Sequence, residues 1–254
     1  MRWTDRPNEY HMSTVVLKHT RLPYGEVCVH WSYAREPTRV HPGVTLVAQC
    51  GTLHPSFSRK GRAVIEFIKV RHQMLHGETL TKLFGLPERA LRSRPAAGVN
   101  SIAWNIWHLL RIEDITLSRF VANVPQVHTT GSWQSNMGIA YGHMGTAMPY
   151  GDVEILSDTI DLAALRGYQQ AVAAQSAQTL AGLDLGRLHH QWDAAHMRAV
   201  IAGEAVCIPA ITEGVISYWG ALNVGRFVLD YTQVHPQSHM GEVGVIAGLL
   251  GVSL

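Results

Sequence analysis

The sequence predicts an all-α protein, an up-and-down four-helix bundle with a loosely structured N-terminal extension. After residue 58, apolar residues recur with the 3.6-residue period of a helix in four long segments connected by loops. This part of the chain shows no strong strand alternation. Residues 1–57 contain several prolines and no sustained helical period. We therefore divide the chain into an N-terminal extension, residues 1–57, and a bundle domain, residues 58–254.

The N-terminal extension carries short runs of β-prone residues at positions 13–17, 26–33 and 44–48. These runs could form a small ribbon on the bundle, or they could belong to a poorly ordered extension. A start codon placed too far upstream would also account for them. The sequence leaves these alternatives open, so no role is predicted for residues 1–57.

The first two helices are predicted from apolar periodicity and from their boundaries. Residues 62–84 follow the helical period and end before a Gly-Leu-Pro sequence. Residues 100–121 form the second helix, with Asn100 or Ser101 as its N-cap and Pro125 as its stop signal.

The second half of the chain predicts two more long helices. Asp158 is expected to cap the third, which covers residues 159–183. A short helix is expected near residues 193–202. The fourth long helix is expected over residues 212–234, with a continuation to about Leu250.

A long connection, residues 126–156, separates the second and third helices and is rich in Gly, Ser and Met. Loops of this length in compact domains usually have a function. The segment holds Trp133, Met137, His143 and Met148, and these side chains could cover a site. The alternative is that the segment packs over the helix ends.

Composition excludes several classes of protein. The chain of 254 residues is 46% hydrophobic and 16% charged, with a net charge of +2, and no basic stripe stands out. A nucleic-acid partner is therefore not expected. No apolar run reaches the 18 residues of a membrane span. The cysteines, three in number, are too few and too scattered for a disulfide framework, which favours a reducing cytoplasm. We expect a small-molecule substrate, and a homodimer is compatible with the sequence.

Histidine is the unusual residue, since the chain has 15. His235 and His239 stand four residues apart, which places both imidazoles on one face of a helix where they can bind one ion. About 0.9 such pairs are expected by chance from the composition, and a second pair, His72 and His76, is present. The spacing alone is therefore weak support for a metal site.

The neighbours of the two pairs favour His235 and His239. Extending their helical row backwards meets mainly aromatic residues, which should face the bundle interior: Tyr231, Phe227, Asn223 and Trp219. His72 and His76 also lie on an apolar row and remain a rival, although we interpret them as partly exposed histidines near a helix end. His108, between Trp104 and Ile112 on its own row, is the best third ligand; the alternative is a core histidine bonded to a backbone carbonyl.

These residues carry a family resemblance. Residues 100–114, NSIAWNIWHLLRIED, resemble the second-helix motif of the DinB-like (DinB/YfiT) superfamily, in which a histidine precedes an apolar pair, an arginine and an acidic pair. Residues 235–242, HPQSHMGE, resemble the closing motif of that family. The spacer is also similar, with a Trp-containing loop and a Leu-Arg-Gly-Tyr helix, so the resemblance covers about residues 60–251.

The resemblance implies a four-helix bundle with a three-histidine site for one divalent metal ion, usually zinc or nickel. Transferred to this chain, the ligands are His108, His235 and His239. The family includes thiol-dependent S-transferases and isomerases that use a low-molecular-weight thiol, proposed hydrolases, and proteins without known activity. This chain departs from the family at Pro236, which would kink a continuous helix or start a new one, and in the 57 residues of its extension.

The chemistry expected of such a site follows from the charge of the ion. Three neutral imidazoles leave a cationic metal with a free position, which can bind a thiol as thiolate or lower the pKa of water to about 7. Glu242 could orient a ligand or act as a base, or it could be a solvated carboxylate, while Glu113 and Asp114 are expected to pair with arginines. No catalytic residue is assigned. The sequence thus predicts a metal-dependent thiol S-transferase or hydrolase; the alternatives are a non-catalytic metal- or ligand-binding bundle and a bundle with a vestigial site.

Overall fold

The computed structural model describes residues 55–254 of the chain. They belong to the compact unit Gly51–Leu254. The β-prone runs expected between residues 13 and 48 lie outside the described residues. The boundary expected near residue 58 stays a prediction.

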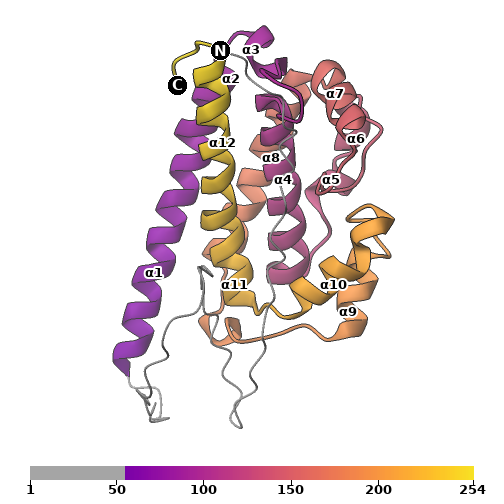
Figure 1. The fold of residues 1–254 in the computed structure, drawn as a ribbon. Coiled ribbons are helices and arrows are strands. Elements are labelled where there is room, and N and C mark those ends of the chain that lie inside the picture. The colour runs from indigo at the N-terminus through magenta and orange to yellow at the C-terminus, as the bar shows by residue number, and fades with distance from the viewer. Residues whose placement is uncertain (1–54) are drawn as a thin grey trace, which may run out of the picture. The chain divides into compact units, whose positions relative to one another are not determined.

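Four long helical segments form the body of this unit (Figure 1). Two of them consist of α-helical parts joined through a π-helical turn, and a third ends in a π-helical turn. Their bounds are α1 Pro55–Met74, η1 Leu75–Thr79 and α2 Leu80–Phe84; α4 Ile102–Ile115 and η2 Thr116–Ala122; α8 Leu162–Ala181; and α11 Val224–Leu229, η5 Asp230–Val234 and α12 His235–Leu249. Residues 55–254 contain no β-strand, so the predicted all-α bundle is confirmed.

Shorter helices fill the connections between the long segments. They are α3 Glu88–Arg92, α5 Val127–Thr130, α6 Trp133–Asn136, α7 Tyr150–Thr159, η3 Leu185–Arg187, α9 Ala194–Ile201, η4 Pro209–Ile211 and α10 Thr212–Gly220. The short helix expected near residues 193–202 is therefore confirmed as α9. No helix among residues 55–254 is both long enough and apolar enough to cross a membrane.

Capping side chains decide where the long helices begin. The hydroxyl of Ser101 accepts a hydrogen bond from the backbone of Trp104, which confirms it as the cap of α4. The third helix was expected to start after Asp158, but that residue lies inside α7, and Asp161 caps α8 instead. The fourth helix was expected from residue 212, but the chain breaks after α10 and Asn223 caps a new start at α11.

The helix directions differ from simple alternation. Arg111 of α4 is hydrogen-bonded to Tyr168 of α8, and further along both helices Val121 and Thr179 line a common cavity. The second and third long helices therefore run parallel, and the order is up, down, down, up (Figure 1). The reason is the crossover between Ala122 and Leu162, which returns the chain to the starting end of α4.

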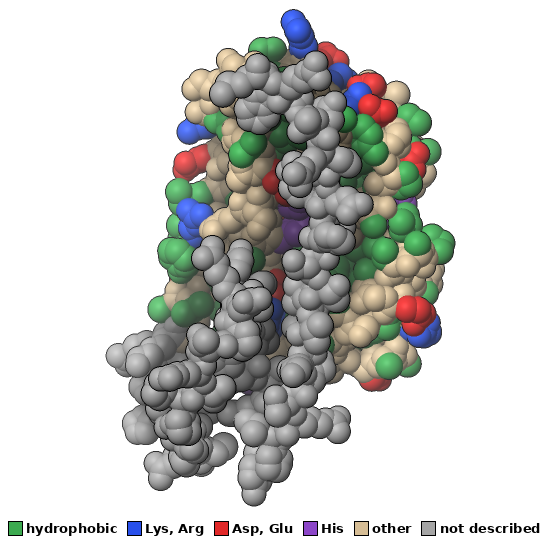
Figure 2. Space-filling view, viewed as in Figure 1, with side chains coloured by type: hydrophobic (Ala, Val, Ile, Leu, Met, Phe, Trp, Pro, Cys, Tyr) green, Lys and Arg blue, Asp and Glu red, His purple; other side chains and the backbone are tan. Residues whose placement is uncertain are grey.

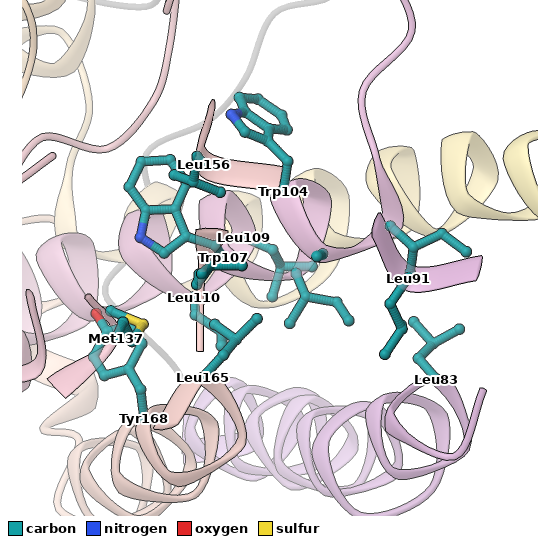
Figure 3. Packing of buried hydrophobic residues seen from close by; sticks show 14 of the residues in the cluster. Leu83, Leu91, Trp104, Trp107, Leu109, Leu110, Met137, Leu156, Leu165 and Tyr168 are labelled. Atoms are coloured by element: carbon teal, nitrogen blue, oxygen red, sulfur yellow. The ribbon is translucent and has the colours of Figure 1, made fainter. Parts of the chain in front are cut away.

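Helix α4 is the centre of the bundle, because all 14 of its residues are buried. Its apolar side chains pack against α8 and against the crossover, as Figure 3 shows for Trp107, Leu110, Leu165 and Met137. Truncating one such leucine to alanine typically costs about 2–5 kcal/mol. A helix buried on every side must also satisfy each of its polar groups internally, and these groups form the sites described below.

Candidate metal centre

Three imidazole rings from two helices converge at one point in the bundle. Nε2 of His235 lies 3.3 Å from Nε2 of His108 and 3.1 Å from Nε2 of His239. A tetrahedral ion with bonds of about 2.0–2.1 Å would hold its nitrogen ligands about 3.3–3.4 Å apart. One ligand atom from each residue lies within 4.8 Å of the others. The structure thus brings together the three residues selected from the sequence, and their spacing fits one ion.

The crossover and α4 hold two of these rings in the tautomer that leaves Nε2 free. His108 donates its Nδ1–H to the backbone carbonyl of Met144. His239 donates its Nδ1–H to Oδ1 of Asn105 at 2.9 Å, and the Asn105 amide is itself fixed through a hydrogen bond to the carbonyl of Ser101. Because these oxygens only accept, the Nε2 lone pairs point at the common point. Outer hydrogen bonds of this kind orient the histidines of metal sites.

The third ring, His235, is placed by an aromatic row. Trp219, Phe227 and Tyr231 contact one another, and Tyr231 contacts His235 with ring centroids 5.9 Å apart. The three aromatic residues are buried, so the interior direction predicted for this row is confirmed. Nδ1 of His235 is buried and has no hydrogen-bond partner among the described residues.

Burial keeps two of the three imidazoles neutral. It lowers the pKa of His108 to about 4, with the neighbouring His239 adding to the effect and the hydrogen bond to Met144 opposing it. It also lowers the pKa of His235 to about 2, with His108 and His239 contributing. At neutral pH both rings are therefore uncharged and each keeps one nitrogen with a free lone pair, which is the form that binds a metal.

Pro236 does not disrupt the row, because a π-helical turn precedes it. The backbone N–H of His235 bonds to the carbonyl of Asp230, five residues back, and Pro236 then stands in the first turn of α12. In the first turn of a helix the backbone N–H has no intrahelical partner, so a proline is tolerated there. The two readings given above, a kink and a new helix start, resolve into a continuous path with a widened turn.

Glu242 lies at the edge of the cluster. One of its carboxylate oxygens is 3.1 Å from Nδ1 of His239, and its side chain is 51% exposed. It is therefore a second acceptor for the Nδ1–H of His239. This contact supports an orienting role for Glu242.

The covering segment, which is the part of the 126–156 connection up to residue 148, reaches this centre. Besides the carbonyl of Met144, it brings the sulfur of Met148 to 3.3 Å from Nε1 of Trp104, whose ring stacks on His108. Gly145 has φ +90°, and a Cβ there would lie 2.6 Å from the ring of Trp107. Only glycine allows the segment to pass so close to α4.

The second histidine pair is not what the sequence suggested. His72 and His76 were expected to be partly exposed, but both are buried. Their Nε2 atoms lie 2.8 Å and 3.0 Å from the two oxygens of Glu113, which is also buried. Glu113 was expected to pair with an arginine and pairs with histidines instead. Spacing along one helix could not reveal this, because the partner is on another helix.

Charge is balanced inside this second cluster. Burial alone would raise the pKa of Glu113, but His76 and His72 hold it well below its usual range. Burial alone would lower the pKa of His72, but the charge and hydrogen bond of Glu113 raise it. A protonated His72 beside an ionised Glu113 is the state that these contacts favour.

Asp114 organises the other side of α4. It accepts hydrogen bonds from the backbone of Val127 and His128 at 2.8 Å each, from Tyr168 at 2.8 Å, and from Arg111 at 3.3 Å. The predicted pairing of Asp114 with an arginine is therefore found. Its bonds to the start of α5 anchor the covering segment, a role that the sequence did not indicate.

Figure 2 shows histidine side chains near the middle of one face of the molecule.

A family model described as the DinB superfamily matches residues 70–205. The match, more than half of the chain, includes His72, His76 and His108 and ends before α12. A search among curated proteins found no match.

Proposed function

The chain belongs to the DinB superfamily, and from that premise we propose that it is a metal-dependent enzyme that activates a small-molecule thiol. The ligands proposed for the single divalent ion, zinc or nickel, are His108, His235 and His239. One observation carries this proposal. Three Nε2 atoms lie close together while acceptors hold the Nδ1 protons of two of the rings. Without an ion between them, the Nε2 lone pairs of His108 and His239 would face the same point, and only a proton on Nε2 of His235 could lie between these nitrogens.

The choice of a thiol over water rests on the carboxylates near the centre. A bound ion would supply a Lewis acid that stabilises a thiolate or lowers the pKa of water. Among the described residues, Glu242 is the carboxylate hydrogen-bonded to these imidazoles. It accepts a hydrogen bond from His239 and is therefore not a free base. Attack by water is helped by a free general base, whereas a thiol ionises near pH 8.5 unaided. The arrangement therefore favours thiol transfer to an electrophilic small molecule.

The surrounding residues give the centre a hydrophobic wall. Trp104 stacks on His108 with ring centroids 4.7 Å apart, and Met144 and Met148 are buried beside it. An apolar wall on one side strengthens the electrostatic effect of a bound cation, because less water screens it. A small electrophile with an apolar part fits this wall better than a highly charged one.

The test measures metal and activity together. The purified full chain should contain one zinc or nickel ion that depends on His239, so that His239→Ala loses it, while the exposed His189→Ala keeps it. Only the metal-loaded wild type should then consume an electrophile in the presence of a small thiol. Hydrolysis of ester or amide panels without any thiol would point to water activation. Bound metal without turnover would leave a binding protein, and absence of the His239-dependent ion would refute the proposal.

A further inference from the structure

We propose that His72, His76 and Glu113 form a second site for a divalent transition-metal ion, distinct from the three-imidazole centre. His72 lies on α1 and His76 in η1, while Glu113 lies on α4. Their ligand atoms come within 4.8 Å of one another, and all three residues are buried. Two imidazoles and one carboxylate on one side of an ion are the ligand set of the facial triad of octahedral metals.

The distances fit an octahedral ion. Bonds of about 2.1 Å at right angles place neighbouring ligand atoms about 3.0 Å apart. The two nitrogen-to-oxygen distances in the cluster are 2.8 Å and 3.0 Å. An ion could thus replace the two hydrogen bonds with little movement of the helices. The three-imidazole centre offers nitrogen ligands alone, whereas this cluster adds a carboxylate, so the two sites differ in their ligand sets.

The cluster contains more imidazoles than charge balance requires. A single protonated imidazole neutralises one buried carboxylate, yet the bundle aims two imidazoles at Glu113. Each buried polar ring loses its hydration, and this loss costs stability unless the ring gains a strong partner. A divalent ion would give both rings and the carboxylate such a partner.

A cavity gives the cluster access to solvent. It has a volume of about 580 Å³, and its wall includes both imidazoles. Glu113 itself is buried and does not line the cavity, so an ion entering from this side would meet the two imidazoles first, and the cavity leaves room for water at the remaining coordination positions. Lys69 and Arg166 also line the cavity, but Lys69 is paired with Glu66 at 2.8 Å. Arg166 would favour an anionic group, such as a carboxylate, as a further ligand of the ion.

Gln169 sets the tautomer of His76. Its Nε2–H donates to Nδ1 of His76 at 3.1 Å, so the imidazole proton lies on Nε2 and points at Glu113. To bind an ion, His76 must carry its proton on Nδ1. The Gln169 amide would then give up its hydrogen bonds to Nδ1 and to the backbone carbonyl of His76, and would turn its oxygen towards the ring to accept that proton. His72 releases its Nε2 proton to solvent. The ion then takes the place of both protons between the imidazoles and the carboxylate.

Cobalt(II) alone is the probe for this site, since its absorption separates tetrahedral from octahedral coordination. The full chain should bind two Co²⁺ per molecule after dialysis against buffer. Folded His239→Ala, checked by circular dichroism, should keep one Co²⁺ with the weak absorption of an octahedral ion. His72→Ala and Glu113→Gln should each lose that ion and keep the intense tetrahedral spectrum. His189→Ala, at an exposed position, should keep both.

The outcomes separate the two sites. If folded His239→Ala retains no Co²⁺, or if its remaining ion persists after His72→Ala is added, the second site is refuted. If His72→Ala does not fold, Glu113→Gln combined with His239→Ala decides: loss of the remaining Co²⁺ supports the site, and its retention overturns it. A wild-type chain with a single ion that depends on His72 and not on His239 would support this site and refute the proposed function.

Discussion

Gly145 marks the closest approach of the covering segment to the three-imidazole centre, and its replacement by alanine tests how tightly the two are joined. A Cβ at this position would lie 2.6 Å from the ring of Trp107 and 3.2 Å from Nδ1 of His108. The ring of Trp107 is fully buried and cannot rotate away. The segment itself must therefore move, and the carbonyl of Met144 moves with it.

The size of the effect follows from two contributions. An alanine held at φ +90° costs about 1–3 kcal/mol in backbone strain. Overpacking against a buried ring costs about 1–3 kcal/mol more. The free energy of unfolding of Gly145→Ala should therefore fall by about 2–6 kcal/mol. Loss of the hydrogen bond from His108 to Met144 should also weaken metal binding on the order of 10–100-fold.

Gly138 offers a matched control in the same segment. It also has a positive φ, +66°, but a Cβ there would meet nothing within 4 Å. Gly138→Ala should cost only the strain of the left-handed backbone, about 1–2 kcal/mol, and should not change metal affinity. Urea denaturation and zinc competition with a chromogenic chelator measure both quantities. If the two variants have equal stability and equal zinc affinity, the segment is not held against His108 as described.

Three further predictions concern residues around α4. Asn105→Leu removes the acceptor at 2.9 Å from Nδ1 of His239. The variant should fold, and its zinc affinity should fall on the order of 10–100-fold. Unchanged affinity in the same chelator competition would rule out the orienting role of Asn105. Tyr168→Phe removes the hydroxyl that is hydrogen-bonded to both Asp114 and Arg111. The free energy of unfolding, measured in urea, should fall by about 1–3 kcal/mol. A loss below the error of the measurement would show that Asp114 and Arg111 find other partners. Burial, with Arg111 contributing, lowers the pKa of His128 to about 3. Below pH 6.5 the unfolded chain therefore takes up a proton that the folded chain excludes, and stability falls as the pH drops towards 3. Between pH 7 and pH 5 this group accounts for about 2 kcal/mol, so His128→Phe should flatten the dependence of unfolding free energy on pH by that amount, and an unchanged slope would contradict it.

Features of the fold that depend on residues close together in the chain could be predicted from the sequence, whereas features that depend on packing could not. The long helices follow from apolar period, and Ser101 as a cap follows from residue type. The parallel course of α4 and α8 does not, since it depends on where the crossover packs. The break before α11 was missed because the apolar pattern continues through residues 220–222, so periodicity alone shows no boundary there.

The histidines show the same limit at the level of the sites. His108, His235 and His239 could be selected because their rows are apolar or aromatic and because a family motif includes them. The same rule placed His72 and His76 on an apolar row, yet we expected them near the surface, since a helix end lies close by. Both are instead buried and contact Glu113, a charged residue on a wholly buried helix. No spacing rule connects a carboxylate with imidazoles some 40 positions earlier.

Pro236 was the main reason to expect a vestigial site, and its position now argues against that interpretation. A proline inside a regular helix removes a hydrogen bond and costs about 3 kcal/mol or more. Here the turn before it is already widened, with His235 bonded five residues back to Asp230. The widened turn leaves His235 and His239 with their Nε2 atoms 3.1 Å apart and facing His108. Acceptors also hold the Nδ1 atoms of two of the rings. The geometry therefore still allows one ion to be shared, and the metal content of His239→Ala decides whether an ion binds there.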